Sequence, residues 1–216
     1  MKRREIVPSK GVATLSSHHP SDLGHRSSGW TFLKAVFCAW GTVGAVAPTS
    51  RGVARRITDL AEAETRHVLA EFGPGTGAIT RELLAALPAD GHLWTFEVYR
   101  PFVDHLRATV DDPRLTVVAE SAEAIVGLYE REGLPGFDAV ISSLPFSLMD
   151  PTQATEILRA VARTLRPGGV FVALQYHPWY LAPLLRAEFP IVEREVYPWN
   201  IPPAMLLRAR RQRQPS

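Results

Sequence analysis

From Arg66 onward, the sequence alternates short apolar runs with longer amphipathic segments, and this alternation limits the fold more than any other feature. Apolar runs rich in β-branched and aromatic residues are typical of strands, and segments with helical periodicity are typical of helices. Strands that alternate with helices predict a parallel sheet covered by helices on both faces. The expected strands are HVLAEF, HLWTFEV, RLTVVA, FDAVISS and GVFVALQY. The expected helices cover about 77–87, 101–109, 121–131 and 151–165.

The end of the sequence departs from this alternation. PIVEREVYPW and PAMLLRARR are two extended runs joined by the short connection NIPP, which leaves no room for a crossover helix. Two strands joined so closely pair antiparallel. The sequence therefore predicts an α/β fold with a mostly parallel, seven-stranded sheet, a C-terminal antiparallel hairpin and helices on both faces. This architecture resembles the Rossmann-like fold of the class I methyltransferases.

Four regions follow from the composition along the chain. The first is polar and contains many Ser, His and Pro residues, which favours disorder. Two helices come next, one over about Trp30–Trp40 and one over RGVARRITDLAEA, with Thr49 or Ser50 as its N-cap. The predicted regions are a disordered tail (1–28), the N-terminal helices (29–65), the methyltransferase core (66–211) and a short tail (212–216).

Composition narrows the class of protein. With 216 residues, 46% of them hydrophobic and 21% charged, the chain has the size and composition of one globular domain. A net charge of +2 is only a weak indication of nucleic acid or of an anionic membrane. The single cysteine, Cys38, lies in an apolar stretch, which favours a buried side chain over a reactive thiol. No secretory signal is evident, and the most apolar stretch, GWTFLKAVFCAWGTVGAVAP, contains Lys34 and several glycines.

The turn EFGPGTG lies between the first expected strand and the helix after it, where glycine permits close approach to a ligand. A Walker phosphate loop is excluded because no Gly-Lys-Ser/Thr follows, whereas the dinucleotide fingerprint is satisfied by Gly73, Gly75 and Ala78. Against a dinucleotide, the Glu71 carboxylate would repel a pyrophosphate and would attract the cationic, sulfonium-bearing amino acid of S-adenosylmethionine. A tight turn without a ligand is the structural alternative. The predicted cofactor-binding residues of the turn are Glu71, Gly73, Gly75, Thr76 and Gly77.

Two further strand ends supply candidates for binding the nucleoside. Glu97 lies near the end of the second strand, where an acid accepts hydrogen bonds from both ribose hydroxyls. After the third strand, class I methyltransferases usually carry an acid against the adenine amino group. In this chain that position is Ser121, which we expect to act with backbone support from Ala122, and Glu120, one residue earlier, is also a candidate.

The loop ISSLPFSLMD follows the fourth expected strand. Ligands of open parallel sheets bind outside the carboxyl ends of the strands, so this loop should rim the site of methyl transfer. In nucleic-acid amino methyltransferases it reads Asn or Asp, any residue, Pro and an aromatic residue, and a side-chain oxygen and a backbone carbonyl accept hydrogen bonds from the target nitrogen. Ser143 takes the Asn or Asp position and is a poorer acceptor. Ser143 and Leu144 are predicted to bind the cofactor, and Pro145 and Phe146 the substrate, with a plain turn at Pro145 as the alternative.

Motifs along most of the chain resemble the bacterial phospholipid N-methyltransferases. GAVAPTSRGVARRI, EFGPGTGAITRELL, SSLPFSLM, LRPGGVFVALQYHP and NIPPA stand in the order of that family, from about Phe32 to Arg208. The resemblance implies transfer of methyl groups from S-adenosylmethionine, with S-adenosylhomocysteine as the product, to the nitrogen of phosphatidylethanolamine and its mono- and dimethyl forms, towards phosphatidylcholine. The same family resembles the ribosomal RNA adenine dimethylases.

Methyl transfer to an amine requires a neutral nitrogen and a group that takes its proton. Because a sulfonium is an activated donor, catalysis consists mainly of aligning the amine with the methyl group. Tyr176 and His177, after the fifth strand, are the candidate catalytic and substrate-binding residues. His177 could take the proton or hold the lipid phosphate, and Tyr176 could face the ammonium product by a cation–π contact. Either side chain could equally lie at the rim without a catalytic role.

A lipid acceptor requires access to a bilayer. The expected first helix places Leu33, Val36, Phe37 and Trp40 on one face, which suits insertion into the membrane interface as well as packing on the core. Together with the family resemblance, this pattern predicts an interfacial lid and anchor. The expected partners are a phospholipid and an anionic membrane surface, for a monomer at the cytoplasmic, inner face of the cell membrane. No metal and no stable nucleic-acid partner are expected.

Two classes of alternative function remain. A ribosomal RNA adenine N6-methyltransferase would need a strong basic surface and usually an added RNA-binding domain. Basic residues gather only in RRITD and in the tail RARRQRQ. A soluble small-molecule amine methyltransferase, or a non-catalytic nucleotide-binding module, would share the cofactor site and lack membrane affinity.

Overall fold

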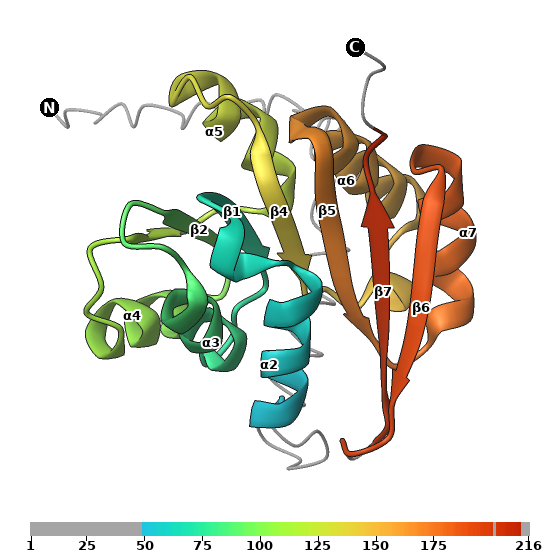
Figure 1. Ribbon diagram of the computed structural model, residues 1–216, viewed down its shortest axis with the longest axis horizontal. Helices are drawn as coiled ribbons and strands as arrows, with labels where there is room; N and C mark the ends of the chain where they lie inside the picture. The colour runs from blue at the N-terminus through green and yellow to red at the C-terminus, as the bar shows by residue number, and fades with distance from the viewer. Residues whose placement is uncertain (1–48, 201, 213–216) are drawn as a thin grey trace, which may run out of the picture.

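A computed structural model describes residues 49–200 and 202–212. A seven-stranded sheet forms its centre (Figure 1). The strands are β1 (Val68–Phe72), β2 (His92–Phe96), β3 (Leu115–Val118), β4 (Phe137–Ser142), β5 (Leu165–Gln175), β6 (Ile191–Tyr197) and β7 (Ala204–Arg210). Their spatial order is β3-β2-β1-β4-β5-β7-β6, with β1 to β5 mutually parallel and β7 antiparallel to both of its neighbours. The predicted parallel sheet with its antiparallel hairpin is confirmed.

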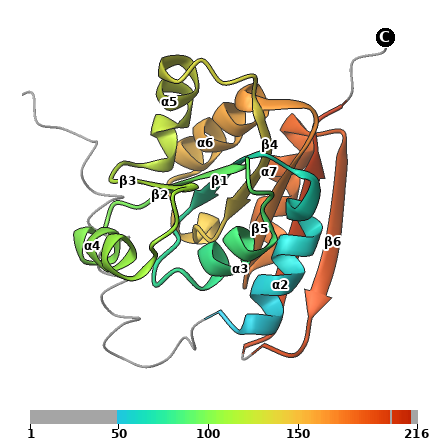
Figure 2. The same ribbon diagram turned by 60° about the vertical axis from the view of Figure 1, so that its left-hand side comes forward.

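Helices cover both faces of this sheet. The helices are α2 (Arg51–Leu60), α3 (Ala78–Ala86), α4 (Arg100–Thr109), α5 (Ile125–Arg131), α6 (Pro151–Thr164) and α7 (Pro178–Glu188). Three short 3-10 turns are η1 (Ala63–Thr65), η2 (Ala122–Ala124) and η3 (Phe146–Leu148). Figure 1 shows α2 and α3 in front of the sheet and α6 and α7 behind it. In the turned view of Figure 2, α2 again lies on the side of the sheet opposite α6 and α7.

The core consists of two apolar layers, one on each face of the sheet. On one face, Ile57 of α2 and Leu83 of α3 pack with Ile141 of β4. On the other face, Leu158 of α6 packs with Val140 of β4. Neighbouring residues of one strand thus serve opposite layers, because successive side chains of a strand point to opposite faces. All six residues of β4 are buried, as expected for a central strand of a parallel sheet.

The start of α2 is fixed by three contacts. The Ser50 side chain accepts a hydrogen bond from Val53 N at 3.4 Å, which confirms Ser50 as the N-cap and excludes Thr49. Ser50 N in turn donates to Asn200 Oδ1 at 3.4 Å, and the Tyr197 hydroxyl leaves no room for a Cβ at Gly52. The beginning of α2 therefore lies beside the connection between β6 and β7.

One helix, α7, is an addition to the predicted elements. Pro183 lies inside it and removes a backbone hydrogen bond, so the local sequence argues against a helix here. Leu181 and Leu185 are completely buried in the layer shared with α6. Burial of these side chains stabilises α7 despite the proline.

Several expectations concern other parts of the chain. The predicted tail 1–28, the helix over Trp30–Trp40 and Cys38 lie outside the described residues. Within residues 49–200 and 202–212, no helix combines the length and the apolar character that crossing a membrane requires.

Candidate functional site

The glycine turn lies where the order of the strands reverses. From β1 the chain proceeds outward to β2 and β3 on one side, and then returns to β4 and β5 on the other side of β1. In open α/β sheets, ligands bind at such a reversal, outside the carboxyl ends of the strands. The predicted candidates Glu71, Glu97, Ser121 and Ser143 lie at or just after the ends of β1, β2, β3 and β4. The fold therefore gathers them at one edge of the sheet.

The three glycines of the turn are all required by its backbone. Their φ angles are +69° at Gly73, +56° at Gly75 and +84° at Gly77, in the left-handed region that favours glycine. A Cβ at Gly77 would come within 2.7 Å of Leu106 Cδ2 in α4. A Cβ at Gly75 would meet only Phe102, at 4.0 Å. Gly77 is thus needed for packing, whereas Gly75 borders open space in which a ligand can lie against the backbone.

The hydrogen bonds of these glycines bear on the choice between the candidate cofactors. Gly73 N donates to Phe96 O at 3.0 Å, and Gly77 N donates to Pro74 O at 2.9 Å. Gly75 N donates to Glu97 Oε2 at 3.2 Å. A phosphate-binding turn points its backbone N–H groups at the anion, but all three glycine N–H groups here are used within the protein. This arrangement argues against the dinucleotide interpretation.

Glu71 is a buried carboxyl group directly before the turn. The side chain is completely buried, and Oε2 accepts a hydrogen bond from Thr80 Oγ1 at 2.7 Å. Within the described structure, Oε1 is buried without a hydrogen-bond partner. Burial raises the pKa of Glu71 to about 8, the Thr80 hydrogen bond opposes this shift, and the charge of Glu97 adds to it. An unpaired oxygen on a buried carboxyl group beside a ligand turn suits a cationic ligand.

Glu97 connects the end of β2 to the glycine turn. Its Oε1 accepts hydrogen bonds from Val98 N and Tyr99 N, both at 2.9 Å, and its Oε2 accepts the bond from Gly75 N. Burial raises the pKa of this carboxyl group, and the three backbone hydrogen bonds oppose the shift. Glu97 therefore holds the turn in place, and its contact with a ribose stays a prediction.

The residues after β3 are arranged around η2. Glu120 is exposed, Ala122 is buried, and Ser121 is the N-cap of η2. The Ser121 hydroxyl accepts a hydrogen bond from Glu123 N at 3.3 Å. The hydroxyl is thus engaged with its own turn, and the contact of this segment with adenine stays a prediction.

The loop after β4 lies against the glycine turn. Ser143 N donates to Phe72 O at 3.0 Å, and a Cβ at Gly73 would lie 3.3 Å from Leu144 Cδ2. The structure thus brings Ser143 and Leu144 to the predicted cofactor site. Thr76, at the far side of the turn, is exposed, and its carbonyl accepts a hydrogen bond from Arg81 Nη1 at 2.7 Å.

Gln175 fixes this loop and was not among the predicted site residues. Its side chain is 3% exposed, and Nε2 donates to Leu144 O at 2.8 Å. The same carbonyl accepts a second hydrogen bond from Phe146 N at 2.9 Å. Both acceptor positions of the Leu144 carbonyl are therefore used, and this carbonyl is not the one that receives an acceptor amine. The available signal was a single amide at the end of an otherwise apolar strand, GVFVALQY.

The expectation for Phe146 needs correction. Its side chain is completely buried and packs edge-on against Phe171, with 6.4 Å between the ring centres. The 3-10 turn η3 directs this ring into the core, below the loop, and not to the rim of a substrate site. Pro145 is half-buried.

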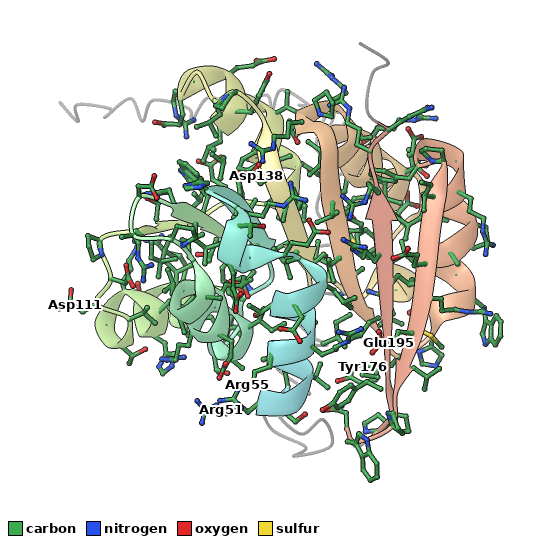
Figure 3. All side chains as sticks on the ribbon, in the orientation of Figure 1. Arg51, Arg55, Asp111, Asp138, Tyr176 and Glu195 are labelled. Carbon is green, nitrogen blue, oxygen red and sulfur yellow. The ribbon has the colours of Figure 1, made fainter. Side chains whose placement is uncertain are left out.

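Tyr176 and His177 follow β5 at the same edge of the sheet. Tyr176 is half-buried, and its hydroxyl accepts a hydrogen bond from Asn200 Nδ2 at 3.4 Å. Burial raises the pKa of Tyr176, with the Asn200 bond acting in the opposite direction, so the side chain is a neutral phenol at pH 7. Figure 3 shows Tyr176 at the lower end of the sheet, near Glu195 and on the side of α2. His177 is exposed at the start of α7.

The described residues contain no group of three or more His, Cys, Asp or Glu side chains that could hold a metal ion. This edge holds two buried carboxyl groups, a glycine turn with open space at Gly75, and the side chains of Tyr176 and His177 after β5. This set fits a cationic nucleoside cofactor such as S-adenosylmethionine.

Comparison with known proteins agrees with this geometry. Residues 69–169 match the family described as a methyltransferase domain. An ornithine lipid N-methyltransferase from Singulisphaera acidiphila is 26% identical over 174 residues, which are 80% of this chain and 91% of that protein. An rRNA methyltransferase from Streptomyces thermotolerans is 40% identical over 112 residues, which are 51% of this chain and 31% of that protein.

Among solved structures, the N-methyltransferase NodS from Bradyrhizobium japonicum, in complex with S-adenosyl-L-homocysteine, shares the fold. Its TM-score is 0.63 with 16% sequence identity, over 85% of this chain and 98% of that one. The methyltransferase fold and the use of S-adenosylmethionine, both predicted from the sequence, are confirmed.

Proposed function

Since this chain is an S-adenosylmethionine-dependent N-methyltransferase, we propose that its acceptor is the amino nitrogen of a membrane lipid, with phosphatidylethanolamine and its mono- and dimethyl forms as substrates. Successive methylation of this nitrogen would lead towards phosphatidylcholine, and the reaction would take place at the membrane surface. One observation carries the proposal: the relative named for a lipid acceptor aligns over nearly its whole length, whereas the rRNA methyltransferase aligns over less than a third of its own.

The cofactor would be held by the turn and by the two buried acids. S-adenosylmethionine supplies a methyl group activated on a sulfonium. Gly75 leaves room for it against the backbone, and the buried Oε1 of Glu71, which has no hydrogen-bond partner in the described structure, would receive its ammonium group. Glu97, already fixed by three backbone N–H groups, keeps acceptor capacity for ribose hydroxyls, because a carboxylate has about four acceptor positions.

The acceptor would enter over the ends of β4 and β5. Leu144, held by Gln175, closes the loop against the glycine turn, which leaves the side of Pro145 and His177 for the headgroup. The attacking amine must be neutral, and we assign the exposed His177 to take its proton or to hold the lipid phosphate. Tyr176 has its hydroxyl fixed by Asn200, so its ring is held in one orientation beside this entrance.

Two other acceptors each have one observation in their favour. An ornithine lipid also presents an amine on a lipid, and it is the acceptor in the name of the relative from Singulisphaera acidiphila. RNA adenine is the acceptor class suggested by the rRNA methyltransferase. The two lipids share an amine headgroup, so they are distinguished only by assay.

The test is a panel of separate acceptors. Purified full-length chain is incubated with methyl-labelled S-adenosylmethionine and with vesicles of phosphatidylethanolamine, vesicles of ornithine lipid, ribosomal RNA or a water-soluble amine. Label in the phosphatidylethanolamine fraction is the expected result. Label in ornithine lipid alone would replace the headgroup and keep the lipid class, and label in RNA or in the soluble amine alone would overturn the proposal.

A further inference from the structure

Exposed apolar side chains are unevenly distributed over the described residues. Five large apolar side chains are exposed there: Leu148, Trp179, Ile191, Val196 and Trp199. The two tryptophans are the most exposed, at 75% for Trp179 and 82% for Trp199. Single exposed apolar residues need no explanation, whereas a group of them on one side of a protein indicates an interaction site.

Four of the five lie at the edge that carries the functional site. Leu148 follows β4, and Trp179 lies in the first turn of α7, directly after β5. Val196 pairs with Met205, which in turn pairs with Gln175 at the end of β5, and Trp199 lies beyond it in the connection to β7. We call Leu148, Trp179, Val196 and Trp199 the apolar rim. Ile191 pairs with Arg210 at the opposite end of the sheet.

Two members of the rim, Trp179 and Val196, are related through α7 and β6. The guanidinium carbon of Arg194 lies 5.4 Å from the ring centre of Trp179, a cation–π contact that joins α7 to β6. Val196 lies on the same face of β6 as Arg194, because alternate residues of a strand share a face. Figure 1 shows the start of α7 and the tip of the β6–β7 hairpin, the elements that carry Trp179 and Trp199, at the lower end of the molecule.

Positive charge lies on one member of this rim and elsewhere at the same end of the molecule. Arg51 and Arg55, in the first turns of α2, both pair with the single carboxylate of Glu82, at 2.8 and 3.3 Å. Arg194 adds a further cation on β6. Figure 3 shows Arg51 and Arg55 at the same lower end of the molecule as Tyr176. Arg194 thus places a positive charge directly on Trp179, and Arg51 and Arg55 add cations on α2, at the same end of the molecule.

We infer that the apolar rim is the surface through which the protein docks on an anionic lipid bilayer, with Trp179 and Trp199 entering the headgroup region. Tryptophan is the side chain that favours the boundary between water and hydrocarbon, and nearby arginines attract anionic headgroups. Docking in this orientation presents the ends of β4 and β5 to the membrane, so a lipid amine reaches the site without leaving the bilayer. The inference rests on the proposed function, because docking serves to reach a lipid acceptor. The docking surface itself is tested by the binding of the protein to vesicles, without any assay of methyl transfer.

The rim differs in location from the anchor predicted in the sequence, the helix over Trp30–Trp40, which lies outside the described residues. Two other occupants compete with the bilayer. Residues 1–48 connect to α2 at Thr49, beside the hairpin tip, so that segment is within reach of the rim. A second copy of the chain is the other competitor. Both would bury the tryptophans against protein, whereas an anionic bilayer suits tryptophan rings that have an arginine beside them.

The experiment compares the double variant Trp179→Ser/Trp199→Ser with Ile191→Ser, which removes an exposed apolar side chain at the opposite end of the sheet. Full-length proteins are floated on density gradients with vesicles of phosphatidylcholine containing phosphatidylglycerol. Exposed tryptophans that bury part of their 150–250 Å² in the interface make a large contribution, so the double variant should bind at least about tenfold more weakly. Ile191→Ser should float like the wild type, and raised salt should weaken the binding of all three.

Further readings separate this inference from the proposed function. Calorimetric affinity for S-adenosylmethionine should be unchanged in the double variant, and its turnover should fall on bilayers more than on a short-chain, dispersed phosphatidylethanolamine. If the wild type methylates no lipid in either form, the proposed function fails, while flotation still decides the docking surface. Unchanged flotation of the double variant overturns the inference. If flotation is unchanged and the double variant has a lowered melting temperature, residues 1–48 cover the rim. If flotation is unchanged and the double variant forms a smaller oligomer, a second copy of the chain covers it.

Discussion

At the scale of the residue, Glu71 shows what the structure adds to the sequence. The sequence places an acid before the glycine turn and predicts a cationic ligand from its charge. In the structure this carboxyl group is completely buried, with one oxygen unpaired, and burial raises its pKa to about 8. In the free protein at pH 7 the group is therefore protonated, and it becomes a counter-charge when a cation arrives.

Glu71 predicts a pH dependence of stability. The unfolded chain loses this proton near the ordinary pKa of 4.5, whereas the folded protein keeps it up to about 8. Because the folded state binds the extra proton between these values, the free energy of unfolding contributed by Glu71 falls as the pH rises from about 5 to 8. Glu71→Gln should be close to the wild type in stability at pH 5 and more stable by at least about 1 kcal/mol at pH 9.

The measurement is denaturant unfolding of both cofactor-free proteins at pH 5, 7 and 9. Glu130→Gln, on the exposed side of α5, serves as the control and should follow the wild type at every pH. A constant difference between Glu71→Gln and the wild type over this range would show that Glu71 does not titrate there.

The open space beside Gly75 predicts the position of the cofactor. A methyl group at Gly75 meets no protein atom closer than 4.0 Å, so Gly75→Ala fills only the space assigned to the ligand. Gly133 has a similar φ of +61°, and nothing lies within 4 Å of its Cβ position, on the connection between α5 and β4. Both alanine variants should lose about 1 kcal/mol of stability from the left-handed backbone.

Calorimetry with S-adenosylmethionine separates the two variants. Gly75→Ala should raise the Kd at least about tenfold, which corresponds to roughly 1.4 kcal/mol, and Gly133→Ala should leave it unchanged. Equal affinities in both variants would mean that the cofactor does not lie against Gly75.

At the scale of the element, the sequence predicted the strands better than their connections. Each expected strand is present in the structure. These strands could be predicted because each apolar run is long enough to be recognised on its own. The loop after β4 was placed correctly, but the inward orientation of Phe146 depends on η3, which no local pattern reveals. The helix α7 was missed because Pro183 opposes it locally and only tertiary burial stabilises it. Gln175 acts on a loop 31 residues away, and such a long-range hydrogen bond cannot be seen in one strand.

Because Gln175 holds the loop after β4, its substitution should affect turnover more than the binding of S-adenosylmethionine. Gln175→Met keeps the length of the side chain and removes the donor to the Leu144 carbonyl, which should cost about 1 kcal/mol of stability. The loosened loop should lower kcat several-fold, with a smaller change in the Kd of S-adenosylmethionine. Gln153→Met is the matched control, because Gln153 Nε2 makes an exposed hydrogen bond to Glu123 on the surface of α6.

Kinetics and calorimetry of these two variants test the role of Gln175 as a positioning residue. A loss of cofactor affinity equal to the loss of kcat would assign Gln175 to general stability of the site. No change in either quantity would remove it from the account.

At the scale of the whole molecule, the strand order places every predicted acid at one edge, and the hairpin brings Asn200 and Trp199 to the same edge. The alternation of strands and helices was sufficient to predict that the acids share an edge, since parallel strands align their carboxyl ends, but not the strand order or the contribution of the hairpin. The exposure of Trp179 and Trp199 was not predictable in the same way, because it depends on which neighbours α7 and β6 leave uncovered.

The central claim is that the methylated atom is a lipid headgroup nitrogen, and a competition in one tube tests it most directly. The full-length protein is supplied with S-adenosylmethionine carrying a deuterated methyl group, phosphatidylethanolamine vesicles and ribosomal RNA together, and mass spectrometry locates the label. The account predicts label on the headgroup nitrogen, and several-fold less of it with Gly75→Ala at limiting cofactor. Label on adenine, with unlabelled lipid, would contradict it.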